Sequence, residues 1–167
     1  MTSAAFWMVS SMLVESDPPS CMKKPSLASH TIDTVMQRLG RLDVLVNNAG
    51  GAHGIDTVAE GKDADWEAMV QSNFLGLMRV TRACLPLMIE NAGSTIINIG
   101  SIAGRVAYEG GSVYCGVKAA EKQITQSLRL EINGTGVRVG TLDPGLAETE
   151  FSMVRFKGDQ SKSDKVY

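Results

Sequence analysis

The stretch LDVLVNNAGG, residues 42–51, decides the fold class of this chain. Its first five residues form a short, nearly continuous apolar run, which is typical of a strand buried on both faces of a parallel sheet. The run ends in Asn47 and Asn48, followed by an alanine and two glycines. Ligands of open parallel α/β sheets bind at the carboxyl ends of strands. The stretch therefore predicts a parallel sheet with a polar turn at its ligand-binding edge.

Helical and strand-like patterns alternate on both sides of this stretch. We expect helix, strand, helix, strand, helix and strand over residues 31–40, 42–46, 63–91, 95–99, 112–133 and 137–142. A short helix is expected near Phe151, and Met69, Met78 and Met88 are predicted core residues because they recur at helical spacing. This alternation implies right-handed crossovers. The predicted fold is α/β, a partial doubly wound Rossmann-type parallel sheet with helices on both faces.

Residues 1–30 do not follow this pattern. Residues 16–29 are rich in Pro, Ser and Lys, which is typical of a linker or of disorder. The apolar residues 4–9 have no basic residue before them, which argues against a secretory signal. We therefore predict a poorly ordered leader over residues 1–30 and one partial domain over residues 31–167.

Composition excludes several classes of function. The chain has 167 residues, 44% of them hydrophobic, and a formal net charge of -2, so it has neither the basic surface of a nucleic-acid binder nor that of a protein attracted to anionic membranes. No apolar run reaches the ~18 residues that span a bilayer. The three cysteines form no disulfide-like or zinc-like spacing with the two histidines. We expect a cytoplasmic protein without a nucleic-acid, membrane or metal partner.

Tyr114 and Lys118 are the first candidates for catalysis. Residues four apart in a helix lie on the same face, and an ammonium beside a phenol lowers the pKa of the phenol. Such a phenol can exchange protons near neutral pH, as a carbonyl reductase or alcohol dehydrogenase requires. Many surface helices carry the same spacing by chance, so the pair alone is also compatible with an ordinary helix face.

Further candidates follow the other two predicted strands. Ser101 comes directly after the strand over residues 95–99, and Pro144 with Gly145 comes after the last strand. Because the carboxyl ends of parallel strands share one edge of the sheet, we expect these residues to converge on Tyr114. Each has a structural alternative, since a serine can cap a loop and Pro-Gly can form a plain turn.

Taken together, five motifs resemble the short-chain dehydrogenase/reductase family over residues 31–167. Ser101 lies thirteen positions before Tyr114, which is the spacing this family shows. The motifs are Asn47-Asn48-Ala49-Gly50, Asn73-x-x-Gly76, Ser101, Tyr114-x-x-x-Lys118 and Pro144-Gly145-x-x-x-Thr149. The stretch FSMVRFKGD, residues 151–159, is similar to the NADP-dependent 3-hydroxy acid dehydrogenases that oxidise serine and L-allo-threonine.

The resemblance implies four catalytic roles. Tyr114 would be the general acid/base on the substrate oxygen, and Lys118 would lower the pKa of Tyr114 and hold the nicotinamide ribose. Ser101 would hydrogen-bond and orient the substrate oxygen. Asn73 would hold a water that extends a proton relay through Lys118.

The resemblance also implies a cofactor and partners. The cofactor would be NADP, with NAD as the alternative, and the substrate a small hydroxy acid or a related alcohol or carbonyl compound. Residues implied along the cofactor are Asn48, Ala49, Gly50, Tyr114, Lys118, Pro144, Gly145, Leu146 and Thr149. The two helices over residues 63–91 and 112–133 would support a homo-oligomer, a dimer or tetramer.

One departure from the family affects cofactor binding. No Thr-Gly-x-x-x-Gly-x-Gly turn, which would cradle the pyrophosphate, occurs before Asn47, and Gly40 is the only glycine there. Losing two or three charge-assisted hydrogen bonds would weaken cofactor binding about a thousandfold or more. We also expect the strand over residues 42–46 to be a bare apolar edge, with residues 4–14 as a less favoured replacement.

The missing pyrophosphate turn leaves three interpretations of the chain open. The chain is a truncated fragment of an NAD(P)-dependent oxidoreductase that retains its catalytic residues, or a catalytically incompetent remnant that retains a subunit-association surface. The third interpretation is a sensor that binds NADP without turnover.

Overall fold

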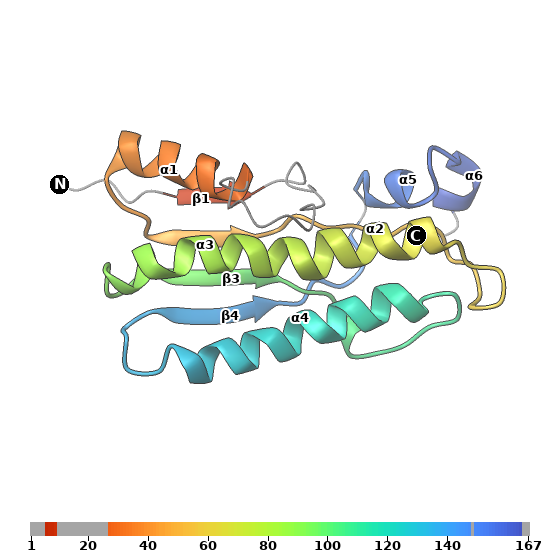
Figure 1. Cartoon of the computed structure of the whole chain (residues 1–167). Helices are drawn as coiled ribbons and strands as arrows, with labels where there is room; N and C mark the ends of the chain where they lie inside the picture. Colours follow the sequence, from red (N-terminus) through yellow and green to blue (C-terminus); the bar gives the residue numbers. More distant parts are fainter. Residues whose placement is uncertain (1–5, 10–26, 148, 165–167) are drawn as a thin grey trace, which may run out of the picture.

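A parallel four-stranded sheet forms the centre of the computed structural model, which describes residues 6–9, 27–147 and 149–164 (Figure 1). The strands lie side by side in chain order. They are β1 (Phe6–Val9), β2 (Val44–Asn47), β3 (Thr95–Ile99) and β4 (Arg138–Leu142). The register aligns Val44 with Thr95 and Thr95 with Arg138, so the carboxyl ends of the strands lie at one edge.

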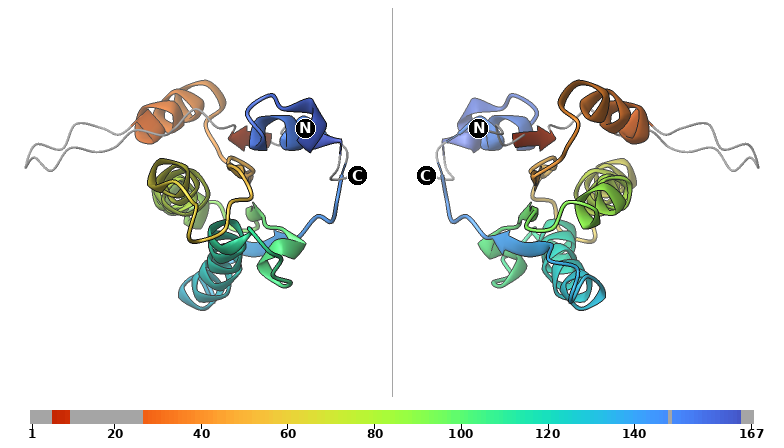
Figure 2. Two further views of the ribbon diagram at one scale, coloured as in Figure 1. Left: turned by 90° about the vertical axis from the view of Figure 1, so that its right-hand side faces the viewer. Right: turned by 90° about the vertical axis from the view of Figure 1, so that its left-hand side faces the viewer.

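Three long helical segments connect the strands and gather on one side of the sheet, whereas α5 and α6 lie on the other side, beyond the strand ends (Figure 2). The connecting segments are α1 (Leu27–Leu39), the continuous run of α2 (Asp63–Met69), η1 (Val70–Gly76) and α3 (Leu77–Ile89), and α4 (Ser112–Glu131). The short elements are the 3₁₀ turn η2 (Ile102–Gly104), α5 (Phe151–Arg155) and α6 (Gln160–Ser163).

The expected α/β alternation and parallel sheet are confirmed. β3 occupies the predicted residues 95–99, and α5 lies at the expected short helix near Phe151. Helix α1 begins at Leu27 rather than at Thr31, because no helix-breaking residue follows Pro25. The predicted helix over residues 63–91 contains a π-helical segment, η1, in its middle.

The expectation of a bare edge at β2 is wrong. Strand β1 pairs in parallel with β2, with Phe6 beside Val44 and Val9 beside Asn47. Four consecutive apolar residues with an aromatic pair suit a strand, and pairing satisfies the backbone groups of an otherwise open edge. Residues 1–5 and 10–26, on which most of the predicted leader falls, lie outside the described residues.

The core lies between the sheet and helices α3 and α4. It consists of Leu42, Leu45, Val80, Cys84, Met88, Ile96, Leu128, Ile132, Val137 and Val139. Two of the three predicted core methionines, Met69 and Met88, are buried. The prediction for Met78 is wrong: it is 42% exposed, because it lies on the side of α3 that lines an open groove with α4.

The described part of the chain contains neither a membrane-spanning helix nor a cluster of metal-ligating side chains. No helix there is both long and apolar enough to cross a bilayer. No three His, Cys, Asp or Glu side chains of these residues gather so that they could hold a metal ion. Cys84 and Cys115 are free thiols, and burial raises the pKa of Cys84 to about 12, so this thiol stays protonated.

Candidate active site

The residues predicted to form the site meet at the carboxyl edge of the sheet. The backbone N–H of Gly100 donates to the carbonyl of Leu142 (2.8 Å), and that of Ile102 donates to the carbonyl of Pro144 (3.1 Å). These bonds join the loop after β3 to the loop after β4. Ser101 and Pro144 therefore lie together at the edge where an α/β sheet binds ligands.

Ser101 is fixed by a turn that packs closely on α4. Its Oγ accepts a hydrogen bond from the backbone N–H of Ala103 (3.1 Å) and thereby caps η2. A Cβ at Gly104 would lie only 2.7 Å from the carbonyl oxygen of Lys118, so glycine permits this close approach. The turn brings the Ser101 hydroxyl close enough to Tyr114 to lower the pKa of its phenol.

Three side chains surround the ring of Tyr114. Lys118 Nζ lies 5.9 Å from the ring centroid, and the guanidinium carbon of Arg155 lies 5.7 Å from it. The ring of Phe151 packs against it with centroids 5.8 Å apart. Phe151 and Arg155 are four residues apart on α5, so this short helix covers Tyr114 with one face.

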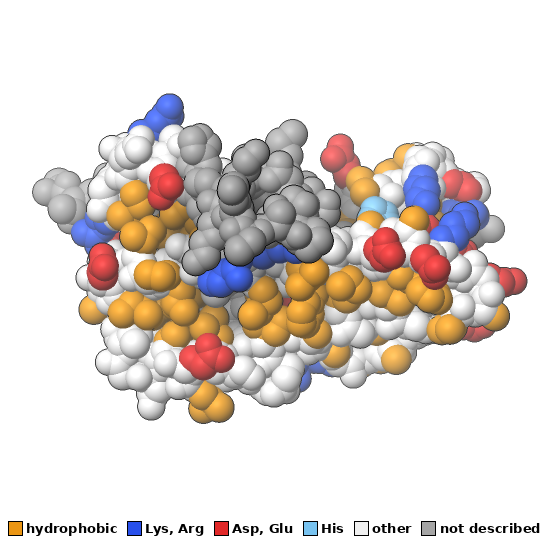
Figure 3. Space-filling view, viewed as in Figure 1, with side chains coloured by type: hydrophobic (Ala, Val, Ile, Leu, Met, Phe, Trp, Pro, Cys, Tyr) orange, Lys and Arg blue, Asp and Glu red, His pale blue; other side chains and the backbone are white. Residues whose placement is uncertain are grey.

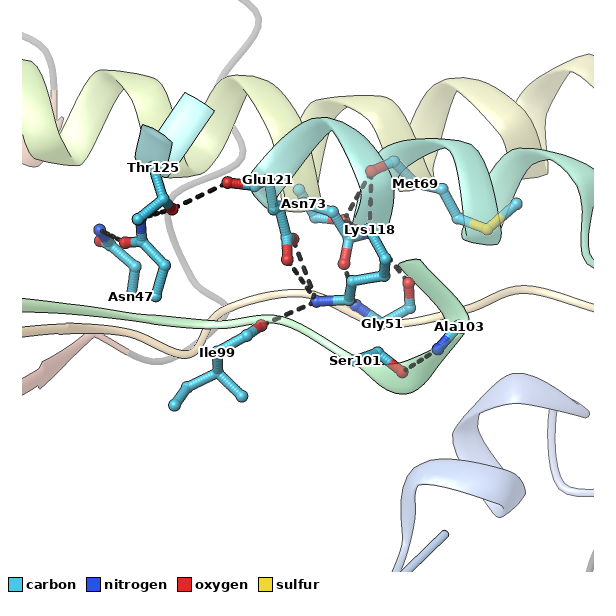
Figure 4. Close-up of polar contacts among 12 residues, drawn as sticks. Asn47, Gly51, Met69, Asn73, Ile99, Ser101, Ala103, Lys118, Glu121 and Thr125 are labelled. Atoms are coloured by element: carbon cyan, nitrogen blue, oxygen red, sulfur yellow. Dashed lines mark hydrogen bonds and ion pairs between the residues drawn. The ribbon is translucent and has the colours of Figure 1, made fainter. Parts of the chain in front are cut away.

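Lys118 forms a buried ion pair with Glu121, one turn further along α4 (Figure 4). Its Nζ donates to both carboxylate oxygens of Glu121 and to the backbone carbonyl of Ile99, each at 3.0 Å. The side chains are 8% and 2% exposed. An ammonium has three N–H donors, and all three are engaged in this arrangement.

The pKa of Tyr114 is raised, not lowered as the sequence predicts. Burial is the largest cause, and the hydrogen bond from Ser101 only partly offsets it. Glu121 raises the pKa of Tyr114 further, whereas Arg155 lowers it. The ammonium of Lys118 is paired with the Glu121 carboxylate, and it does not offset the effect of burial on this pKa. Burial raises the pKa of Glu121 to about 7, against the opposing effect of Lys118.

Asn73 lies wholly buried in the π-helical segment η1 and anchors the loop after β2. Its Oδ1 accepts from the backbone N–H of Gly51 (3.1 Å), and its Nδ2 donates to the carbonyls of Gly51 and Met69 (both 2.9 Å). A Cβ at Gly50 would overlap Asn73 Oδ1. The side chain expected to hold a water is therefore engaged with the loop itself, and it positions residues 48–51.

The remaining predicted cofactor residues surround open space. A Cβ at Gly51 or Gly145 would meet no atom within 4 Å, so neither glycine is closely packed by its neighbours. The exposed residues of this rim are Asn48, Gly50, Pro144, Gly145 and Leu146, and Ala49 is half-buried between them. Thr149 has a local partner instead, because its Oγ1 accepts from the backbone N–H of Phe151 (3.2 Å).

The residues that the resemblance places beside the nicotinamide are thus mostly exposed at the strand ends, whereas none of them belongs to a pyrophosphate-binding turn. In the family pattern the pyrophosphate turn follows the strand that precedes the first helix. Here the corresponding residues 10–26 contain no glycine and lie outside the described part of the chain.

Sequence reasoning did not single out Glu121, Arg155 or a buried polar chain beneath the site. In that chain Asn47 Nδ2 donates to Asn98 Oδ1 (2.8 Å), and Asn98 Nδ2 donates to Thr125 Oγ1 (2.8 Å). Figure 4 labels its two end residues, Asn47 and Thr125. The spacing of Glu121, three residues after Lys118, is a signal for an ion pair on one helix face. Nothing in the sequence pattern indicates that this pair is buried.

Comparisons with known proteins agree with this geometry. Residues 21–160 match the family model of the short chain dehydrogenases. The chain is 48% identical to an NADP-dependent 3-hydroxy acid dehydrogenase of Schizosaccharomyces pombe, over 81% of this chain and 52% of that protein. It is 46% identical to sulfoacetaldehyde reductase 2 of Chromohalobacter salexigens, over 81% of this chain and 54% of that protein.

A solved structure of a dehydrogenase also matches this chain. The closed form of a serine dehydrogenase complexed with NADP+ superposes with a TM-score of 0.78 at 44% identity. The match covers 83% of this chain and 58% of that one. The chain thus spans about half the length of the curated relatives that it matches.

Proposed function

This chain belongs to the short chain dehydrogenase family, and from that premise we propose that it is an oxidoreductase using NADP and a small hydroxy acid. The observation that carries the proposal is the convergence of Ser101, Tyr114 and Lys118 at the carboxyl edge of a parallel sheet. NADP is favoured over NAD because the 3-hydroxy acid dehydrogenase relative is NADP-dependent and the serine dehydrogenase structure holds NADP+.

The proposed chemistry assigns a proton to Tyr114 and orientation to Ser101. The nicotinamide, when bound, supplies the hydride acceptor or donor. Tyr114 accepts the hydroxyl proton of the substrate during oxidation and returns it to the carbonyl oxygen during reduction. Ser101 donates a hydrogen bond to the same substrate oxygen. Because burial raises the pKa of Tyr114, the phenol is protonated at neutral pH, which is the form that reduction requires.

The names of two relatives point to a substrate that carries an anionic group. A 3-hydroxy acid has a carboxylate, and sulfoacetaldehyde has a sulfonate, close to the carbon that is oxidised or reduced. The two anions differ in geometry but share a negative charge. We therefore propose an acidic substrate for this chain.

The proposal is tested with the full chain, NADPH and a small oxo acid, by following absorbance at 340 nm. Tyr114→Phe is expected to lower turnover about a hundred- to ten-thousandfold while NADPH binding, measured by fluorescence, is kept. Undiminished turnover in Tyr114→Phe would contradict the assignment. If wild type and Tyr114→Phe both bind NADPH and neither turns over, the chain is better described as a sensor that binds NADP without turnover. If neither binds NADPH, it is better described as a catalytically incompetent remnant.

One surface favours subunit association as a second function. Helices α3 and α4 border an open, mostly apolar groove of about 790 Å³. Its lining includes Phe74, Leu75, Met78, Leu85 and Ile124. Figure 3 shows hydrophobic side chains gathered over this side of the molecule. We propose that a second copy of this chain covers the groove.

A further inference from the structure

Arg155 is a buried cation beside the proposed catalytic tyrosine. It lies on α5, beyond the carboxyl ends of the strands (Figure 1), and is only 8% exposed. Its Nε donates to the carbonyl of Gly54 (2.9 Å), and one terminal nitrogen donates to the hydroxyl of Tyr108 (2.9 Å). These two bonds orient the guanidinium from two different loops.

The charge of Arg155 has no counterion within the described residues. Both of its hydrogen-bond acceptors are neutral, and the other groups against it are the rings of Tyr108, Tyr114 and Phe156. A guanidinium has five N–H donors, and only two have a partner in the part of the chain that the structure describes. Other buried or half-buried charges do have partners: Lys118 pairs with Glu121, and Arg41 with Asp43.

An uncompensated buried charge is costly, and a fold tolerates it where a ligand supplies the opposite charge. A guanidinium is also the side chain best suited to bind a carboxylate or a sulfonate through two parallel hydrogen bonds. The unpaired donors of Arg155 therefore indicate an anion of this chemistry.

Arg155 lies beside Tyr114, the residue proposed to contact the substrate oxygen, and so is better placed to bind the substrate than the cofactor. Its guanidinium carbon lies 5.7 Å from the ring centroid of Tyr114. Gly54, whose carbonyl accepts from Arg155, and Tyr114 line the same small cavity, of which Arg155 itself is not a lining residue. A small acid whose hydroxyl reaches Tyr114 can thus direct an acidic group two carbons away toward Arg155. We propose that Arg155 binds the carboxylate or sulfonate of the substrate and that Tyr108 holds the guanidinium in place for it.

This assignment rests on the proposed function for the identity of the acid, but its test needs neither NADPH nor turnover. The full chain is titrated with sodium 3-hydroxypropanoate and with neutral 3-hydroxypropanamide, and binding is followed by NMR chemical shifts. Wild type is expected to bind the acid about ten- to a hundredfold more tightly than the amide. Arg155→Gln is expected to reduce this affinity ratio to about one. Arg155→Lys keeps the positive charge but lacks the two parallel N–H donors of a guanidinium, so it is expected to retain part of the ratio.

Lys157→Gln is the matched control, because it removes a positive charge two residues away from a side chain that pairs with Asp65 instead. It is expected to keep the wild-type ratio. Equal affinity of wild type for acid and amide, no measurable binding of the acid, or a preference that survives in Arg155→Gln would overturn the assignment. Selective binding of the acid in a chain that shows no hydride transfer would leave this site standing and refute the proposed oxidoreductase function alone.

Discussion

Lys118 Nζ lies 3.0 Å from both carboxylate oxygens of Glu121, in an ion pair that is almost wholly buried. Both residues belong to α4, and the pair connects this helix to the end of β3, because the same ammonium also donates to the carbonyl of Ile99. Removing one partner of a buried pair leaves the other charge uncompensated. We therefore expect Glu121 to limit how far the positive charge of Lys118 lowers the pKa of Tyr114.

Substitution of Glu121→Gln is expected to lower the pKa of Tyr114. The amide keeps the size of the side chain, removes the negative charge that raises this pKa, and leaves the ammonium of Lys118 unneutralised. The measurement is an alkaline titration of tyrosinate absorbance, with Tyr114→Phe identifying the contribution of this ring. Glu131→Gln, an exposed change on the same helix, is the control. An unchanged titration of Tyr114 in Glu121→Gln would show that the carboxylate has no such effect.

The same residue predicts how stability depends on pH. The pKa of Glu121 is about 7 in the folded chain against 4.5 ordinarily, so between these values the folded state binds the proton more tightly. The stabilisation is fully present below pH 4.5 and is lost as pH rises toward 7, by up to about 1.4 kcal/mol per pH unit. Urea unfolding of wild type and Glu121→Gln from pH 4.5 to 7.5 measures this slope. The variant is expected to lose the Glu121 part of it, and parallel curves for the two proteins would contradict the prediction.

Local patterns predict the elements of this fold but not the partners of its side chains. β3 and α4 follow from apolar runs, helical spacing and glycine stops, which are local. The strand β1 has only four residues, too few to indicate a strand without its neighbour β2. The pKa of Tyr114 depends on burial and on Glu121, and the exposure of Met78 depends on which side of α3 meets the sheet. Both are set by tertiary packing, which a single sequence does not contain.

Asn73→Ala is expected to destabilise the chain by about 2–4 kcal/mol, because it removes the partners of the Gly51 N–H and of the Gly51 and Met69 carbonyls. Asn73→Asp is not expected to restore stability, since a carboxylate has no N–H to donate to these carbonyls. Urea unfolding gives the free energy. Ser72→Ala is the control in the same turn. The Ser72 hydroxyl donates to backbone carbonyls of its own helix and accepts one long hydrogen bond from Asn73 Nδ2 (3.3 Å), so this change leaves the bonds of Asn73 to Gly51 and Met69 in place. Its cost is expected to stay within about 1 kcal/mol.

The buried polar chain predicts that Thr125→Val costs about 1–3 kcal/mol. Valine matches the shape of threonine but leaves the Nδ2 of Asn98 without its acceptor, beneath a sheet from which water is excluded. Thermal and urea unfolding measure the loss. Thr57→Val makes the same chemical change at an exposed hydroxyl that bonds to Glu60, so its effect is expected to stay within about 0.5 kcal/mol. Equal effects of the two variants would mean that the polar chain adds nothing to stability.

The groove between α3 and α4 predicts that Met78→Lys weakens self-association. Met78 is 42% exposed in one chain, and its burial by a second copy would stabilise a dimer by about 0.6–1.3 kcal/mol for each side chain. A two-fold interface contains the residue twice, so the dissociation constant is expected to rise at least about tenfold. Sedimentation velocity over a range of concentrations measures it. Leu130→Lys is the control, because Leu130 is 80% exposed on α4 and does not line the groove. A wild-type chain that sediments as a monomer throughout, or a Met78→Lys variant that associates like wild type, would refute the idea that a second copy covers this groove.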